Sequence, residues 1–182
     1  MARYIAILRG INVGGKKKIL MKDLKEVFME IGYFNIQTYV QSGNVIFDSE
    51  NDISTTKLEK NIENAIEKAN KFKVNVIITT PPRLKKIISN NPFKPKADDL
   101  KRNYLVLLKK NPKPEDIGEL ENFHSPDEFK IDGDHIYVRY SSKYSDSKLN
   151  NNFFENKLGV SASTRNWRTI LKLEEITEST PT

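Results

Sequence analysis

The segment from Arg9 to Lys16 carries the most chemically informative spacing in the chain, Arg-Gly-Ile-Asn-Val-Gly-Gly-Lys. It contains the G-x-x-x-x-G-K spacing of a phosphate-binding loop, in which glycine amides approach an oxyanion and the lysine reaches the outer phosphate. Lys17 stands where such nucleotide hydrolases carry the serine or threonine that binds Mg²⁺. The spacing therefore favours anion binding over nucleotide hydrolysis, through the residues Arg9, Asn12, Gly14, Gly15 and Lys16. Alternatively, the glycines only permit unusual backbone angles in a long turn.

A second polar group, from Gln41 to Asn44, sits at the turn of a predicted hairpin. In a β-α-β-β-α-β domain, the loop after the first strand and the hairpin between strands two and three share one end of the sheet. We therefore expect Gln41, Ser42 and Asn44 to converge with the glycine loop on a small polar or phosphate-bearing ligand. The alternative is that they are ordinary turn residues that bond locally.

A third group surrounds the only tryptophan, in Thr164-Arg-Asn-Trp-Arg168. If it opens a closing helix over residues 166–175, Arg165 and Asn166 lie in its first turn, where an anion is favoured. Trp167 would then stack on a base or ring. Alternatively, Trp167 anchors the helix to the core and Arg165 pairs with an acidic neighbour.

The sequence shows no motif for a metal centre or for RNA recognition. Cysteine is absent and there are two histidines, His124 and His135, which disfavours a metal centre. One face of a predicted strand carries His135, Tyr137 and Arg139, but the RNA-recognition signature is missing and the surroundings are acidic. We predict no catalytic residue, no metal and no cofactor, and the residue patterns leave open whether the protein is an enzyme.

The charge is unevenly distributed along the 182 residues, whose formal net charge is +6. Residues 81–110 hold nine basic and two acidic side chains, whereas residues 113–136 hold two basic and eight acidic ones. The basic segment suggests nucleic acid or an acidic protein as a partner. Equally, a lysine-rich composition with seven arginines can reflect genome composition rather than a ligand. Because no apolar run approaches a membrane span, we expect a cytoplasmic protein without membrane contact.

Apolar periodicity places the elements that would position these groups. Strands are predicted over 4–8, 36–41, 44–48 and 74–79. One helix is predicted from Leu20 to Ile31, and a second from Leu58 to Ala69 with Thr56 and Glu59 as its capping box. The same order is predicted to recur as a strand over 104–108, a helix over 114–123, a hairpin over 128–140 and a helix over 146–158.

These elements predict an α+β protein with two ferredoxin-like halves of βαββαβ type, each an antiparallel sheet with packed helices. The expected boundaries are 1–80 for the first half, 81–101 for a basic bridge, 102–176 for the second half with its C-terminal helix, and 177–182 for a disordered tail. Both faces of the first strand are apolar, so we expect its sheet to be covered on both sides.

Four segments together resemble domain-of-unknown-function family 1697: Arg9–Gly15, Thr38–Phe47, Asn91–Phe93 and Thr164–Trp167. The resemblance extends from Tyr4 to about Leu173. It implies two similar α/β halves in a largely bacterial, cytoplasmic and uncharacterised family, and it implies no activity, cofactor or catalytic residue.

Three functions remain open from the sequence. The leading hypothesis is binding of a phosphate-bearing ligand, a nucleotide or a nucleic-acid end, by the 9–16 loop and the 41–44 hairpin. The second is an enzyme on a small phosphorylated substrate that works by positioning and electrostatics. The third is an interaction module for protein or nucleic acid that uses the basic segment 81–110. The oligomeric state does not follow from the residues.

Overall fold

The computed structural model describes residues 1–50 and 52–179 and divides the chain into two compact units. The first unit comprises residues 1–85 and the C-terminal residues from 173 onward, and the second comprises residues 86–172. The division falls within two helices, α3 (Pro81–Ser89) and α6 (Trp167–Ser179). The end of the C-terminal helix thus belongs with the first unit, whereas the sequence had placed the whole helix in the second half.

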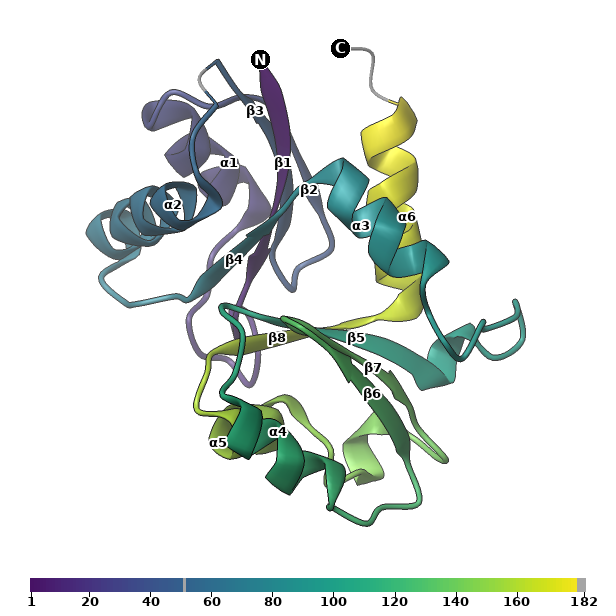
Figure 1. The fold of residues 1–182 in the computed structure, drawn as a ribbon. Coiled ribbons are helices and arrows are strands. Elements are labelled where there is room, and N and C mark those ends of the chain that lie inside the picture. The colour runs from purple at the N-terminus through teal and green to yellow at the C-terminus, as the bar shows by residue number, and fades with distance from the viewer. Residues whose placement is uncertain (51, 180–182) are drawn as a thin grey trace. The chain divides into compact units, whose positions relative to one another are not determined.

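The first unit has the predicted β-α-β-β-α-β order. Its elements are β1 (Ala2–Leu8), α1 (Met21–Glu30), β2 (Phe34–Tyr39), β3 (Asn44–Ser49), α2 (Thr55–Asn70) and β4 (Val76–Thr79). The four strands pair antiparallel in the order β2-β3-β1-β4, and α1 and α2 cover one face (Figure 1). This is the ferredoxin-like arrangement.

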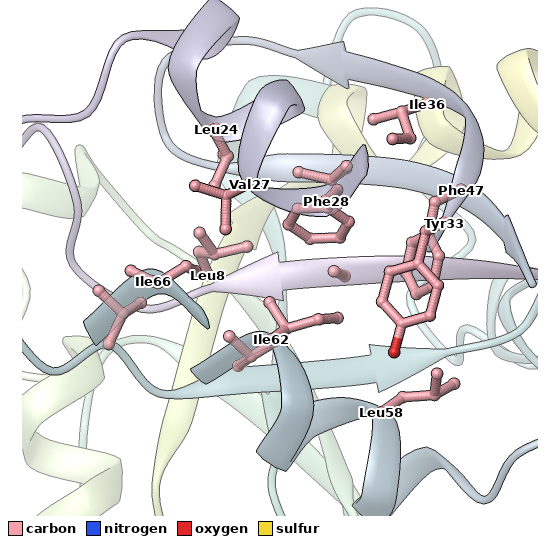
Figure 2. Close-up of a cluster of buried hydrophobic side chains, with 14 of the residues drawn as sticks. Leu8, Leu24, Val27, Phe28, Tyr33, Ile36, Phe47, Leu58, Ile62 and Ile66 are labelled. Atoms are coloured by element: carbon pink, nitrogen blue, oxygen red, sulfur yellow. The ribbon is translucent and has the colours of Figure 1, made fainter. Parts of the chain in front are cut away.

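The core of the first unit lies between its sheet and its two helices (Figure 2). Leu24, Val27 and Phe28 recur at helical spacing in α1, and Leu58, Ile62 and Ile66 do so in α2, so each helix presents one apolar stripe to the sheet. Phe47 of β3 joins an aromatic cluster there, with its ring 4.7 Å from Tyr33 and 5.3 Å from Phe28. In β1, Ile5 and Ile7 on the opposite face are buried as well, which agrees with the expectation for this strand.

The second unit repeats the same order. Its elements are β5 (Asn103–Leu108), α4 (Pro114–Glu121), β6 (Glu128–Asp132), β7 (His135–Arg139), α5 (Asn151–Leu158) and β8 (Ala162–Asn166), with short 3₁₀ turns at Leu100–Arg102 and Tyr144–Asp146. The strand order is β6-β7-β5-β8, and α4 and α5 pack against one face (Figure 1). The chain is therefore an α+β protein with two ferredoxin-like halves, which confirms the predicted fold class.

Several predicted elements have different limits. Residues 162–166 form the strand β8, which the sequence did not predict, so Arg165 and Asn166 end a strand instead of opening a helix. Helix α5 begins at Asn151 rather than at residue 146, because the Asn150 side chain caps it by accepting a bond from the Phe153 amide. The predicted capping box of α2 is wrong, since Ser54 is the N-cap and Glu59 bonds elsewhere.

The end of the chain also differs from the expectation. Helix α6 continues to Ser179, three residues into the segment 177–182 that was predicted to be disordered. The remaining residues of that predicted tail lie outside the described part of the chain.

Equivalent main-chain bonds mark the same place in the two halves. At the end of β1, the Leu8 amide donates to the carbonyl of Gly43 in the hairpin turn, at 2.8 Å. At the end of β5, the Leu108 amide donates to Asp134 of the second hairpin turn, also at 2.8 Å. The next amides, of Arg9 and Lys109, donate to Asn75 and Ser161 just before β4 and β8, both at 2.9 Å. The two halves can therefore be compared residue by residue at this end of the sheet.

Candidate functional site

The glycine loop and the hairpin turn meet through the side chain of Asn12. Its Nδ2 donates to the Ile19 and Gln41 carbonyls, each at 2.9 Å, and its Oδ1 accepts from the Ile19 amide at 2.9 Å. One side chain thus closes the loop on itself and ties it to the β2–β3 turn. The predicted convergence of these two segments is present, and Asn12 produces it.

Close packing explains the glycine at the hairpin turn. Gly43 has φ of +84°, and a Cβ there would lie 2.7 Å from Ile11 Cδ1 and 2.8 Å from Leu8 Cβ. Both the backbone angle and the space therefore require glycine at this position. Ile11 and Ile19 are themselves buried, so the loop is anchored in the core on both sides of its tip.

The tip, residues 13–18, is exposed throughout. The Lys16 amide donates to the Val13 carbonyl at 3.1 Å, and the Asn12 amide donates to the Lys17 carbonyl at 3.2 Å, which folds the tip into a tight turn. In the described ranges, no hydrogen bond is formed by the amides of Gly14 and Gly15. These two amides are thus available to an acceptor from outside the chain.

The loop lysines differ in their contacts. Lys17 Nζ donates to the Lys73 carbonyl at 2.7 Å, so this side chain holds the loop to the segment before β4. Lys16 carries no hydrogen bond or ion pair from its side chain within residues 1–50 and 52–179. Lys16 is therefore a loop cation that can meet an anion.

Apolar side chains accompany these polar groups, and the sequence analysis missed them. Val13, Leu20 and Val40 are 64%, 67% and 45% exposed, and they belong to the loop and to the hairpin turn. In the sequence, branched apolar residues in and around a glycine- and lysine-rich loop could have indicated these contacts. They offer an apolar contact beside the cationic tip.

The other predicted residues of this region make hydrogen bonds within the chain. Asn44 is buried, and its Nδ2 donates to the Tyr39 carbonyl at 2.8 Å and to Ser42 Oγ at 3.3 Å. Gln41 contributes its carbonyl to the Asn12 clamp, and the Arg9 amide donates to Asn75. These bonds follow the local-turn alternative for Ser42 and Asn44.

The third predicted group lies in the second unit, at the junction of β8 and α6. Arg165 is buried and its Nη1 donates to Ser163 Oγ and to the Thr164 carbonyl, both at 3.0 Å. Asn166 Oδ1 accepts from the Arg168 amide at 2.9 Å, which starts α6. Trp167 is 2% exposed, with its ring 6.2 Å from that of Tyr137. The burial of Trp167 follows the packing alternative, in which this side chain anchors the helix to the core.

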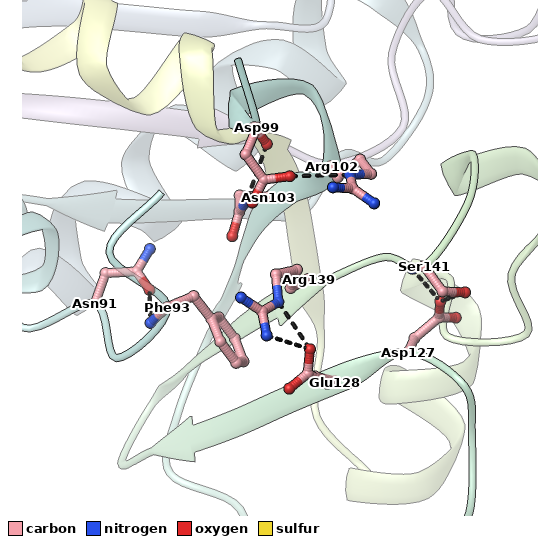
Figure 3. A network of polar contacts seen from close by, with 9 residues as sticks. All are labelled: Asn91, Phe93, Asp99, Arg102, Asn103, Asp127, Glu128, Arg139 and Ser141. Atoms are coloured by element: carbon pink, nitrogen blue, oxygen red, sulfur yellow. Dashed lines mark hydrogen bonds and ion pairs between the residues drawn. The ribbon is translucent and has the colours of Figure 1, made fainter. Parts of the chain in front are cut away.

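The face of β7 that carries His135, Tyr137 and Arg139 is occupied by the chain itself. The Tyr137 hydroxyl donates to the Ile87 carbonyl at 2.8 Å, and burial raises the pKa of Tyr137 to about 12. The Arg139 guanidinium lies 5.0 Å from the centre of the Phe93 ring and bonds to Glu128 (Figure 3). This face therefore offers no open platform for stacking bases.

An acidic group lies beside this face, around Asp127 (Figure 3). Asp127 Oδ1 accepts from the Ser141 amide at 2.8 Å and from its hydroxyl at 2.9 Å, and Ser147 donates to Oδ2. Burial disfavours the ionised carboxyl, but these hydrogen bonds outweigh it and lower the pKa of Asp127. Asp127 therefore acts as a local anchor for the segment after β7.

Two hollows lie along edge strands. One, of about 520 Å³, is lined by residues 33–37 at β2 with Lys25 and Met29 of α1. The other, of about 450 Å³, is lined by residues 127–131 at β6 with Pro92, Phe93 and Glu121. Across the described ranges, no group of three histidine, cysteine, aspartate or glutamate side chains could hold a metal ion. None of the helices described there has the length and apolar character needed to cross a bilayer.

A family model described as a protein of unknown function, DUF1697, matches residues 1–137. The chain belongs to this family. The match contains the glycine loop, the first hairpin and Asn91–Phe93, which are three of the four segments that carried the resemblance. A search of curated proteins finds no match to the chain.

Among solved structures, the chain is similar to the conserved bacterial protein SP0830 from Streptococcus pneumoniae. The two share 22% identity with a TM-score of 0.75, over 96% of this chain and 98% of that one. At this identity the likeness establishes a shared fold over nearly the whole of both chains.

Proposed function

We propose that this DUF1697 protein binds a phosphate-bearing ligand, a nucleotide or a nucleic-acid end, at the loop tip formed by residues 13–18. The observation that carries the proposal is the difference between two equivalent connections. Residues 109–113 suffice to join β5 to α4, whereas residues 9–20 join β1 to α1. The same fold needs five residues for this connection, so most of the longer loop serves something other than connectivity.

The loop has the chemistry of a small anion site. The amides of Gly14 and Gly15 and the Lys16 ammonium are exposed together at one tip, and glycine lets an oxyanion approach the backbone closely. The Asn12 clamp holds the tip in one conformation before any ligand arrives, which lowers the entropy lost on binding. Val13, Leu20 and Val40 provide apolar contact for a base or ring next to the phosphate.

A thermal-shift panel at low salt tests this proposal, with pyrophosphate, ATP and a 5′-phosphorylated single-stranded oligonucleotide as probes. A probe at 100 times its dissociation constant stabilises the fold by about 2.7 kcal/mol. For a chain of this size, the melting temperature should rise by roughly 5–10 °C. Consumption of the probe at catalytic protein concentration would show that the site also transforms its ligand.

Lys16→Ala should reduce the shift without lowering the stability of the free protein, because the Lys16 side chain makes no internal bond within the described residues. Lys60→Ala, an exposed lysine of α2, is the matched control and should keep the full shift. Absence of a shift with every probe, or an unchanged shift in Lys16→Ala, would contradict a phosphate site at this tip.

A further inference from the structure

The four sheet edges differ in how their outward main-chain groups are protected, and those of β6 are the most open. Edge strands expose unpaired N–H and C=O groups that can pair with another chain, so proteins usually block or distort them. The edges here are β2 and β4 in the first unit and β6 and β8 in the second.

The outer edges of β4 and β8 are blocked by side chains of the preceding helices. In the first unit, Glu59 and Glu63 of α2 accept from the Ile78 and Val76 amides at 3.0 and 2.8 Å. In the second unit, Glu155 of α5 accepts from the Ala162 amide at 2.9 Å, and Asn151 donates to the Ala162 carbonyl at 3.1 Å. A partner strand would have to displace these side chains.

The β2 edge is distorted rather than blocked. Its register with β3 is broken between Phe34 and Gln37, and Asn35 in the gap adopts φ of +50°. Bulges of this kind twist an edge away from a partner strand. The hollow along β2 therefore lies beside an irregular main chain.

The β6 edge is regular and open. Glu128 to Asp132 pair without interruption with Arg139 to His135 of β7. The two-residue turn that closes this hairpin leaves the main-chain groups of Phe129 and Ile131 facing outward. In the part of the chain that the structure describes, no side chain bonds to them as glutamates do at β4 and β8.

A groove runs along this open edge. Residues 127–131 line it together with Pro92, Phe93 and Glu121, the last residue of α4. Its volume of about 450 Å³ has room for side chains of an added strand. Main-chain pairing and side-chain pockets are thus both present, which is the combination that strand addition uses.

The charged side chains along β6 indicate which kind of strand can pair with its open edge. Glu128, Lys130 and Asp132 alternate with Phe129 and Ile131, so one face of the strand reads negative, positive, negative. Directly opposite charges stabilise a cross-strand pair and like charges destabilise it. A second copy of β6 paired over all five residues, parallel or antiparallel, would place like charges opposite one another at each charged position.

We propose that the β6 edge receives an extended peptide segment of another protein, with basic side chains opposite Glu128 and Asp132, an acidic one opposite Lys130, and apolar residues between them. Glu128 can serve this role while bound to Arg139, because both Arg139 bonds go to Oε2 and, among the described residues, no donor bonds to Oε1. This surface lies within the second unit and is independent of the phosphate site, which belongs to the first.

Fluorescence anisotropy with labelled, end-capped peptides tests the proposal on the full chain. The peptide Lys-Val-Glu-Val-Lys should bind about fivefold more tightly than Lys-Val-Lys-Val-Lys, because only the central cross-strand pair changes from opposite to like charge. N-methylation of the two valines should abolish binding, since the strand then loses main-chain donors.

Lys130→Glu should reverse the preference between the two peptides, because its strand face becomes uniformly acidic. Lys130 is exposed, so the variant should fold, and circular dichroism checks this. Lys148→Glu changes the same charge away from the groove and should leave the preference unchanged. No binding of Lys-Val-Glu-Val-Lys, equal binding of the N-methylated peptide, or an unchanged preference in Lys130→Glu would overturn the proposal.

Discussion

Each half of the molecule places an arginine directly opposite a carboxylate on a neighbouring antiparallel strand. In the first half, Arg3 of β1 faces Asp48 of β3, with Nε 2.8 Å from Oδ1. In the second half, Arg139 of β7 faces Glu128 of β6, with Nε 2.7 Å from Oε2. The side chains of the first pair are 9% and 5% exposed, whereas those of the second are 36% and 56% exposed.

The difference shows that one cross-strand motif can have two uses. Arg3 bonds to both oxygens of Asp48 and Asn35 adds a third bond, and the Arg3 hydrogen bond, opposed by burial, lowers the pKa of Asp48. Removing one partner of such a pair leaves a buried charge uncompensated. The exposed pair is screened by water and contributes little to stability, which leaves Glu128 available to a partner.

Asp48→Ala should produce the largest effect, because Arg3 then remains buried without its carboxylate. We expect the free energy of unfolding to fall by about 3–5 kcal/mol, measured by urea denaturation. A loss below about 1 kcal/mol would remove the distinction between the two pairs.

Glu59→Ala and Glu155→Ala test whether the blocked edges of the two halves are equivalent. Each variant frees an edge amide, and we expect a loss of about 1–3 kcal/mol in the free energy of unfolding. Size-exclusion chromatography should also show more self-association, because an open edge can pair with another chain. Glu67→Ala, an exposed residue of α2, serves as the control for the first variant.

The pH dependence of the free energy of unfolding should come mainly from Asp48 and Asp127, whose pKa values are both lowered in the folded chain. As the pH falls, the unfolded chain takes up protons at the ordinary carboxyl pKa, before these folded groups do. Their stabilisation is therefore complete above about pH 5 and is lost progressively at lower pH. In acid titrations of the free energy of unfolding, Asp48→Asn and Asp127→Asn should each flatten the curve.

Glu128→Ala should have the smallest effect on stability, at most about 1 kcal/mol, because the Arg139 pair is exposed. The same variant should weaken the peptide Lys-Val-Glu-Val-Lys if this carboxylate meets a basic side chain of the bound strand. A large loss of stability would instead make this pair structural, like Arg3 and Asp48.

Local patterns predicted most of the fold. Leu24, Val27 and Phe28 recur at helical spacing, and Asp132-Gly133-Asp134 gives a short hairpin turn, so these elements follow from neighbouring residues. Strand β8 could not be predicted from neighbouring residues, because Ser163, Thr164 and Arg165 lack an apolar alternation. Their pairing with β5 makes them a strand. Glu59 was assigned to a cap because its spacing fits one, but its partner is the distant Ile78 amide.

The arrangement of the glycine loop and the hairpin turn was predicted in part. The topology placed the glycine loop beside the hairpin turn, and the Asn12 bond to Gln41 realises that convergence. The division of labour among its residues was not predictable, because Lys16 and Lys17 are adjacent and chemically identical. Their roles separate because Lys17 lies within reach of the Lys73 carbonyl, a contact 56 residues away in the chain.

The sequence by itself determined the order of the elements in the first half, the glycine positions at which the backbone turns, and the charge pattern along β6. These properties depend on neighbouring residues and on backbone sterics, which act before the chain is packed. The tertiary structure decided which arginine–carboxylate pair is buried, which sheet edges are blocked and which loop lysine bonds to the segment before β4. Burial and edge pairing join residues far apart in the chain, so their energies exist only once the sheets have formed.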